Sequence, residues 1–183
     1  TNTNQQRAIK LFSNKQEISI DDKKTVKIPF DQKIPVVVFE PSHLYFITTS
    51  PEMRRQLIDD ILEKTDPEFS LLKNSYTKTL RQRNSLLKHR LSEIKKQIFA
   101  WDIRLSELGG RYVDKRKQLL RYINTSTSET YSSIAGHKHT LQLLYETKVS
   151  GGQYASKLLS LLQDKLELDH MRGYTGYGPH RDD

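Results

Sequence analysis

The sequence has no cysteine, which excludes disulfide bonds, thiolate metal sites and cysteine nucleophiles. Glycine is missing from residues 1–108, and no apolar run approaches the roughly 18 residues that a membrane-spanning helix needs. No basic and then apolar leader opens the chain, so nothing in it indicates secretion. These absences lead us to expect a cytoplasmic protein that has no membrane partner.

Two segments hold the basic charge of the chain. Residues 81–96 and 111–121 together carry more positive charge than the net +8 of the whole sequence. Such a concentration of cations is what DNA binds, through phosphate contacts and the release of counterions. The alternative is that the cations only solvate the exposed face of a helix. The candidate DNA-binding residues are Arg81, Arg83, Lys88, Arg90, Lys95, Lys96, Lys115, Arg116 and Lys117.

The first forty residues are expected to form short strands. Apolar and polar residues alternate over residues 18–20 and 26–30, and a hairpin turn is expected between them at residues 21–24. Residues 35–39 form a continuous and mostly β-branched run, typical of a buried strand. Three short strands do not make a complete domain, so we expect them to be the edge of a larger sheet.

Most of the remaining chain is expected to be helical. Ser50 before Pro51 is an N-cap followed by a proline at the first helical position, and residues 66–67 repeat the signal. From Leu87 to Leu108 the apolar residues recur at alternating spacings of three and four, the pattern of a coiled-coil seam. Trp101 lies on this seam, which favours core packing over stacking on a base.

All the glycines of the chain lie in its second half. The pair Gly109 and Gly110 would ordinarily end a helix, although the apolar stripe continues beyond it. Residues 124–136 are rich in serine and threonine, and residues 140–147 alternate like a strand. A last helix is expected from residue 154 to a glycine cap near residue 173.

Several sequence strings occur in an order that resembles one known family. They are V-V-V-F-E-P at residues 36–41, S-P-E-M-R-R-Q-L-I-D at 50–59, L-R-Q-R-N-S-L-L-K at 80–88, W-D-I-R-L-S-E-L-G at 101–109 and G-Y-T-G-Y-G-P-H-R-D-D at 173–183. Their succession is similar to that in the RecF family, bacterial recombination ATPases related to SMC and Rad50 proteins. We therefore expect this chain to be an internal piece of a larger protein.

The resemblance implies a fold and a function. The fold class would be α+β and mainly helical: an antiparallel helical hairpin, or short coiled-coil lid, with edge strands of an ABC-type ATPase head. Residues 1–49 would end the first head lobe, residues 50–172 would form the lid, and residues 173–183 would begin the second lobe. The hairpin would reverse between Lys88 and Ser92, with Ser92 as a possible helix cap.

The whole protein, by the same resemblance, would bind double-stranded DNA near single-strand gaps and help to load a RecA-like protein. It would use ATP and Mg²⁺, dimerise with ATP and work with a RecR-like partner. The residues near the nucleotide or the dimer interface would be His180, Arg181, Asp182 and Asp183. The alternative for Arg181 and the two aspartates is a salt-bridge cluster that only supports the fold. A further alternative for the chain is a helical hairpin that docks a protein partner without touching DNA.

The sequence itself supplies no catalytic motif. It contains no G-x-x-x-x-G-K-[ST] loop to hold phosphates and no acidic pair after an apolar strand. We therefore expect no ATP hydrolysis by this chain alone, and no bound cofactor. His137 and His139 could point to one side of a strand, but without a nearby carboxylate they are weak evidence for zinc. Arg54 and Arg55 lie unfavourably near a helix start, which indicates an acidic partner, most simply an intramolecular salt bridge.

Overall fold

The computed structural model describes residues 6–13, 15–30, 40, 45–48, 50–149, 151 and 153–183. The chain divides into two compact units, Thr1–Val38 and Phe39–Asp183, which are described separately below. The predicted strand at residues 35–39 lies outside the described residues. The fold class is α+β and mainly helical, as predicted.

The first unit is a three-stranded antiparallel sheet in the order β1 (Arg7–Phe12), β2 (Lys15–Ile20) and β3 (Lys23–Thr25). The expected hairpin turn is confirmed: Asp21 and Asp22 join β2 to β3 with φ of 47° and 62°. Positive φ at both central residues matches the right-handed twist of the flanking strands.

The expected strand over residues 26–30 is wrong. The strand β3 ends at Thr25, and Val26 is 94% exposed. The alternation of Val26, Ile28 and Phe30 therefore does not mark a half-buried strand, because the first of these side chains has no surface to pack on.

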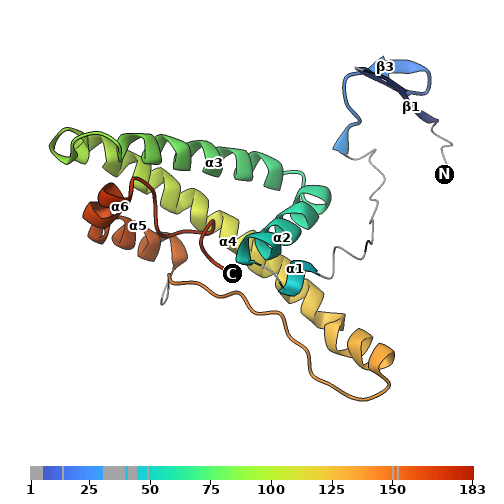
Figure 1. Cartoon of the computed structure of the whole chain (residues 1–183). Helices are drawn as coiled ribbons and strands as arrows, with labels where there is room; N and C mark the ends of the chain where they lie inside the picture. The colour runs from blue at the N-terminus through green and yellow to red at the C-terminus, as the bar shows by residue number, and fades with distance from the viewer. Residues whose placement is uncertain are drawn as a thin grey trace. The chain divides into compact units, whose positions relative to one another are not determined.

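The second unit is helical (Figure 1). Its helices are α1 (Tyr45–Thr48), α2 (Pro51–Thr65), α3 (Phe69–Leu86), α4 (Leu91–Ala135), α5 (Tyr154–Asp164) and α6 (Leu166–Arg172). The cap of α2 is confirmed, because the Ser50 hydroxyl accepts a hydrogen bond from the Met53 N–H at 3.4 Å. The helix α3 begins at Phe69, two residues after Pro67, and the Asp66 carboxylate accepts from the Glu68 N–H at 3.0 Å. None of the described helices is long and apolar enough to cross a membrane.

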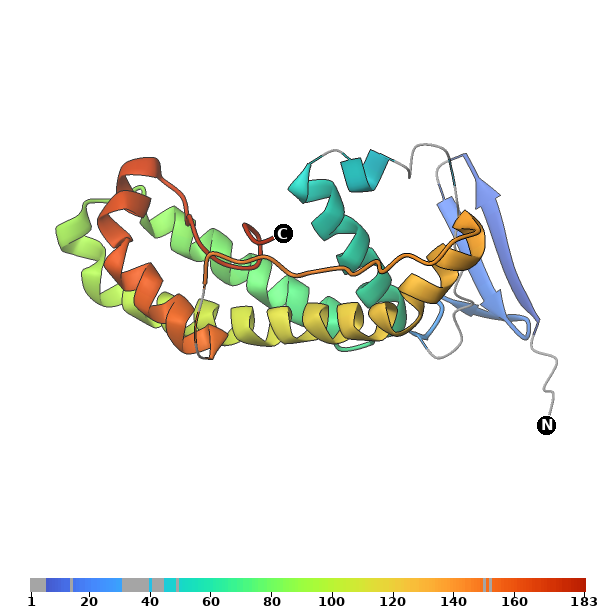
Figure 2. The same cartoon turned by 90° about the horizontal axis from the view of Figure 1, so that it is seen from below.

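The reversal of the chain between α3 and α4 is also confirmed. The two helices run side by side in Figures 1 and 2, and Leu80 of α3 packs against the core cluster that contains Leu105 of α4. The cap of α4 differs from the prediction: Arg90 occupies the N-cap position and makes no side-chain cap, and Ser92 already lies in the first turn. The turn is held instead by the Lys88 and His89 N–H groups, which donate to carbonyls of the last turn of α3.

The core of the second unit lies where α3, α4 and α5 meet. Its fully buried side chains include Phe69, Leu105, Leu158 and Leu162, and the ring of Tyr112 lies edge-on to that of Phe69 with centroids 5.0 Å apart. A smaller cluster of Leu87, Ile94 and Ile98 closes the hairpin turn. Trp101 is only half-buried and Asp102 takes the interior place beside it, so the prediction of core packing for Trp101 holds in part.

The helix α4 continues through Gly109 and Gly110 because α5 packs directly on them. A Cβ on Gly109 would lie 2.9 Å from Leu158 Cδ2, and a Cβ on Gly110 would lie 3.0 Å from Ala155 Cβ. Two glycines weaken a helix by about 1 kcal/mol each. Here they allow the close contact that buries Leu158 and Leu162, so packing outweighs propensity.

The substitution Gly110→Val tests this contact. We expect it to lower the free energy of unfolding by about 1–3 kcal/mol, because the added methyl groups would force α5 away from α4. Urea denaturation of Gly110→Val and of Gln118→Val, at an exposed position of the same helix, provides the comparison. Equal stability of the two variants would show that the glycine contact is not needed.

The Ser/Thr-rich residues 124–136 continue α4, which runs to Ala135 and ends at Gly136 in the left-handed conformation, φ 73°. The prediction of a strand over residues 140–147 is wrong, because these residues belong to no sheet. They are extended and run back along the last turns of α4 (Figure 2), where helix side chains hold their backbone. The serines and the asparagine of α4 thus replace a partner strand.

Candidate functional site

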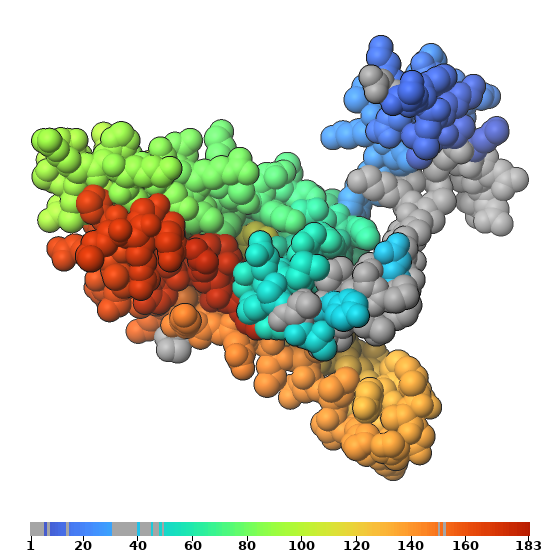
Figure 3. Space-filling model, viewed as in Figure 1, coloured from blue at the N-terminus to red at the C-terminus, as the bar shows by residue number. Residues whose placement is uncertain are grey.

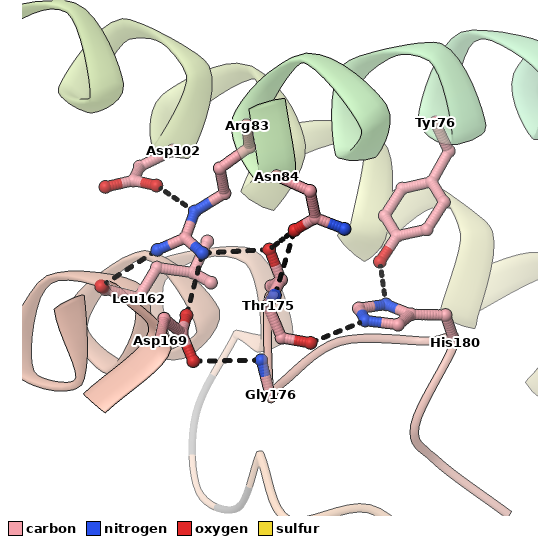
Figure 4. Close-up of polar contacts among 9 residues, drawn as sticks. All are labelled: Tyr76, Arg83, Asn84, Asp102, Leu162, Asp169, Thr175, Gly176 and His180. Carbon is pink, nitrogen blue, oxygen red and sulfur yellow. Dashed lines mark hydrogen bonds and ion pairs between the residues drawn. The ribbon is translucent and has the colours of Figure 1, made fainter. Parts of the chain in front are cut away.

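The C-terminal tail, residues 173–183, lies against the helical hairpin through three buried polar clusters (Figure 4 shows two of them in part). The first is centred on Arg83 of α3, the second on His180 and Asp59, and the third on Asp182. Each cluster joins the tail to at least one residue that is 28 or more positions away along the chain. The tail is therefore part of the lid's packing.

The first cluster encloses the guanidinium of Arg83, which is fully buried. Its Nε donates to Asp102 Oδ1 at 2.6 Å and its Nη1 to Asp169 Oδ2 at 2.7 Å, so one cation faces two buried carboxylates from α4 and α6 (Figure 4). Nη1 also donates to the Thr175 hydroxyl at 2.8 Å, and Nη2 to the Leu162 carbonyl at 3.2 Å. Burial raises the pKa of Asp102, and Arg83 opposes that rise.

The same cluster fixes the start of the tail. The Asn84 side-chain oxygen accepts from the Thr175 N–H at 2.9 Å and from its hydroxyl at 2.7 Å. The Asp169 carboxylate accepts from the Gly176 N–H at 3.0 Å (Figure 4). Neighbouring residues 83 and 84 of α3 therefore both hold Thr175, and Asp169 of α6 holds Gly176.

His180 lies in the second cluster, between Tyr76 and the tail backbone. Its Nδ1 is 2.7 Å from the Tyr76 hydroxyl and its Nε2 is 3.1 Å from the Thr175 carbonyl (Figure 4). A carbonyl only accepts, so Nε2 carries the proton and Nδ1 accepts from Tyr76. Burial lowers the pKa of His180 to about 4 and raises the pKa of Tyr76, which keeps both groups neutral at pH 7.

The depressed pKa of His180 predicts a pH dependence of stability. Unfolding returns the imidazole to its ordinary pKa near 6.5, so protonation favours the unfolded chain. The stability from this group is complete above about pH 6.5 and is lost as the pH falls toward 4, by up to about 3 kcal/mol. Urea denaturation from pH 7.5 to 4 measures this loss.

The matched control for this measurement is His180→Gln. Its amide can accept from Tyr76 and donate to Thr175, but it does not titrate. We expect the variant to lose less stability than the parent between pH 6.5 and 4, since other groups contribute equally to both. The same loss in both proteins would contradict the assigned protonation state of His180.

Arg116 of α4 forms the other half of the second cluster. Its Nε and Nη2 donate to the two carboxylate oxygens of Asp59 on α2, at 2.8 and 2.9 Å. The remaining Nη1 donates to the Pro179 carbonyl at 2.7 Å, and the Tyr112 hydroxyl donates to Asp59 at 2.8 Å. Arg116 is 3% exposed, so this bidentate pair joins α2, α4 and the tail inside the lid.

The third cluster surrounds Asp182, whose carboxylate accepts from three hydroxyls. They belong to Tyr145 at 2.9 Å, Thr147 at 2.7 Å and Tyr154 at 2.6 Å. Burial, and then the charge of Asp182, raises the pKa of both tyrosines, so they remain donors. The Asp182 carbonyl accepts from Arg55 at 2.8 Å.

The charged residues on either side of Asp182 are also engaged. Arg54 pairs with Asp183 through two donors, Nε at 2.8 Å and Nη2, and its hydrogen bond lowers the pKa of Asp183. The intramolecular salt bridge expected for Arg54 is thus present. The guanidinium of exposed Arg181 lies 4.9 Å from the centre of the Tyr174 ring.

Three of the four tail residues predicted to lie near the nucleotide make side-chain hydrogen bonds within the chain: His180, Asp182 and Asp183. A cavity of about 360 Å³ is lined in part by His180, Arg116, Asp59 and Lys73. Two of its cations are already paired, Arg116 with Asp59 and Lys73 with Glu63, which lies outside the lining. Within the described part of the chain, no three histidine or carboxylate side chains gather as metal ligands. The ring centroids of His137 and His139 lie 4.4 Å apart, and the His139 ring also lies 5.8 Å from the Tyr131 ring.

The structure separates the nine predicted DNA contacts into three groups. Arg83 and Arg116 are buried and ion-paired, so their assignment to DNA is wrong: a phosphate cannot reach them. Lys115 and Lys117 form the second group, in which each ammonium contacts another side chain. Lys115 Nζ lies 2.6 Å from Asp66 Oδ2, and Lys117 Nζ lies 5.6 Å from the centre of the Tyr145 ring. The remaining five are exposed: Arg81, Lys88, Arg90, Lys95 and Lys96.

Those five cations surround the turn between α3 and α4. Arg81 lies five residues before the end of α3 and Lys96 five residues after the start of α4, so all five fall within about 8 Å of the turn along the helix axes. The turn is exposed at one end of the unit, with α6 beside it (Figure 3), and His170 of α6 contacts the His89 carbonyl there at 2.9 Å.

Known proteins with the same arrangement are RecF proteins. Over 178 residues the chain is 33% identical to the DNA replication and repair protein RecF of Clostridium acetobutylicum, a match that spans 96% of this chain and 49% of the relative. A solved structure of the recombination mediator protein RecF-ATPrS in the RecFOR pathway superposes with a TM-score of 0.79 at 25% identity, covering 98% of this chain and 50% of that one. The chain belongs to the RecF family.

Further comparisons agree with the assignment to the RecF family. RecF of Geobacter sulfurreducens is 31% identical over 182 residues, which are 96% of this chain and 49% of the relative. The recombination mediator protein RecF-ATP gives a TM-score of 0.76 over 92% of this chain and 47% of its own. No protein-family model matches the chain. This RecF-family chain spans about half the length of the curated relatives it matches.

Proposed function

We propose that this RecF-family chain supplies the helical lid of a DNA-binding protein in DNA repair, and that the lid contacts duplex DNA through the turn between α3 and α4. The observation that carries the proposal is the exposed group of Arg81, Lys88, Arg90, Lys95 and Lys96 around that turn. Glu93 is the only carboxylate in residues 81–96, so the group has a strong net positive charge. Cations that make no buried pair can neutralise phosphates and release counterions.

The rest of the proposal concerns the whole protein. Solved relatives are described as RecF-ATP and RecF-ATPrS in the RecFOR pathway, which supports ATP as the ligand of the intact protein and a RecR-like protein as a partner. The family resemblance adds Mg²⁺ and a RecA-like partner to the proposal. In that protein residues 1–49 would belong to one head lobe, residues 50–172 to the lid and residues 173–183 to the start of the second lobe. The intact protein would be an ATP-dependent, homodimeric DNA-binding ATPase that acts near single-strand gaps.

Binding of this chain to labelled 30-base-pair duplexes, intact or with a central single-strand gap, tests the proposal. Fluorescence anisotropy should show micromolar or weaker affinity at physiological salt, because phosphate contacts alone are weak and independent of sequence. Affinity should rise as salt is lowered. Absence of binding in 50 mM salt would contradict a DNA role for the lid, and equal affinity for both duplexes would place any preference for gaps elsewhere in the protein.

A partner-docking role is the second candidate, and a different surface favours it. Apolar side chains are exposed toward the end of α4 and on the extended segment: Tyr122 is 76% exposed, Ile134 81% and Leu144 68%. Exposed apolar groups that gather on one part of a surface typically mark a protein interface. This role predicts that neutralising the cations at the hairpin turn leaves the function of the lid unchanged.

A further inference from the structure

The extended segment that follows α4 has an ordered edge, because α4 supplies the hydrogen bonds of a missing strand. The Asn124 side chain accepts from the Leu143 N–H and donates to the Leu143 carbonyl, both at 2.8 Å. One turn further along α4, the Ser128 hydroxyl makes the same two contacts with Leu141, both at 2.9 Å. Positions 124 and 128 are four apart, so they lie on one face of α4, in a row that continues to position 132.

The third member of the row is Ser132, which contacts the His139 N–H at 3.1 Å and its carbonyl at 3.2 Å. The residues held by α4 are therefore 139, 141 and 143. In an extended chain the N–H and C=O of alternate residues point to opposite edges. The backbone groups of Thr140, Gln142 and Leu144 consequently point away from α4, and none of them bonds to the backbone of a residue that the structure describes.

The edge of the extended segment that points away from α4 already carries the first hydrogen-bonded pair of a strand ladder. The Asp183 N–H donates to the Glu146 carbonyl at 2.9 Å, and the Glu146 N–H donates back to the Asp183 carbonyl. An exchange of both bonds between the same two residues is the hydrogen-bonded pair of an antiparallel ladder. Residue 146 has the same parity as 140, 142 and 144, so this pair lies on the edge that α4 leaves open.

An apolar cavity of about 390 Å³ lies beside this edge. It is lined by Leu57 and Ile58 of α2, Leu120 of α4 and residues 143–146 of the extended segment, and Asp183 lies at its rim. Figure 3 shows the segment (orange) on the surface of the unit. An unpaired strand edge next to an apolar cavity is the arrangement that accepts an added strand: its backbone bonds the edge and its side chains fill the cavity.

We propose that residues 140–146 are a template for one antiparallel β-strand that continues the backbone directly from Asp183. The Glu146–Asp183 pair sets the register. The second residue after Asp183 would pair with Leu144, the fourth with Gln142 and the sixth with Thr140, because hydrogen-bonded pairs recur every two residues. The strand would be apolar on one face, since that face covers Leu57, Ile58 and Leu120.

The test appends seven residues, alternating valine and threonine, after Asp183 and follows amide hydrogen exchange by NMR. The amides of Thr140, Gln142 and Leu144 should exchange at least tenfold more slowly in the extended protein. The amides of Leu141 and Leu143 are the internal reference, because α4 holds them in both proteins. The control extension has proline at its second and fourth positions, which removes the N–H groups that would bond Leu144 and Gln142.

Three outcomes separate the possibilities. Slower exchange with the valine–threonine extension and not with the proline extension supports the template. Unchanged exchange of Thr140, Gln142 and Leu144 in the extended protein overturns it. Protection of these amides in the parent chain that grows with protein concentration would show that a second copy occupies the edge, and this also overturns the assignment to a strand joined to Asp183.

Discussion

Replacing Arg83 by methionine is expected to lower the free energy of unfolding by about 3–5 kcal/mol, the cost of leaving buried carboxylates without their partner. Arg83 is fully buried between Asp102 and Asp169, and its other donors reach Thr175 and the Leu162 carbonyl. Methionine fills much of the volume but donates no hydrogen bond. The C-terminal tail should also become less tightly held in this variant, because Thr175 and Gly176 are bound by the same cluster.

Urea denaturation followed by circular dichroism measures the effect, with Arg81→Met as the matched control. Arg81 is exposed on the same helix, so its replacement should change stability by no more than about 0.5 kcal/mol. Adding Asp102→Asn and Asp169→Asn to Arg83→Met should recover part of the loss, since the unpaired negative charges are then gone. If Arg83→Met and Arg81→Met are equally stable, the buried cluster does not hold the lid together.

Local signals in the sequence predict where α2 begins and which face of α4 is buried. The serine and proline at residues 50–51 begin α2 as expected, and the alternation of threes and fours from Leu87 places the buried face of α4. The turn at residues 21–22 follows in the same way from local chemistry. The reversal after α3 needs the family resemblance, because the heptad pattern runs through the turn without interruption.

The buried arginines cannot be separated from the surface cations by counting charge. Arg83 and Arg116 lie in the two basic segments, and only their position along the helix distinguishes them. Arg83 follows Tyr76 by seven residues and precedes Leu87 by four, so it lies on the apolar stripe and faces the core. The carboxylates that meet these arginines come from residues 59, 102 and 169, and such distant pairing leaves no local signal.

The end of α4 shows a similar limit. Serine and threonine favour turns over helix interiors, so the composition of residues 124–136 does not predict that α4 continues through them. Their side chains instead bond the extended segment that runs back along α4, a gain that local propensity does not include. The row of Asn124, Ser128 and Ser132 at a spacing of four is the one local sign of a polar helix face.

Neutralising the exposed cations of the hairpin turn is expected to weaken DNA binding by about a hundredfold or more in 50 mM salt. The variant replaces four residues with glutamine: Arg81, Lys88, Arg90 and Lys96. Each phosphate that a cation no longer neutralises keeps about one counterion that binding would have released. Arg83 is kept, because its removal would damage the fold and confuse the comparison. Circular dichroism and urea denaturation should show that the variant is as stable as the parent, since none of the four side chains is buried.

A matched control removes the same charge from another part of the chain. Lys10, Lys15, Lys23 and Lys27 are exposed residues of the β-sheet unit, and replacing them with glutamine gives the same net charge. If DNA is attracted only by the overall charge, both variants should weaken binding equally. If the hairpin turn is the contact surface, the control should retain most of the parent affinity at a fixed salt concentration.

The salt dependence of duplex binding tests the role of the hairpin turn most directly. The slope of log affinity against log salt should be shallower in the hairpin variant than in the parent by about 0.9 for each phosphate that the variant no longer neutralises, and by about 3–4 if all four cations touch DNA. The sheet control should keep the parent slope. A hairpin variant with the parent slope would contradict a DNA-contacting lid, and the lid would then be better explained as a surface for a protein partner.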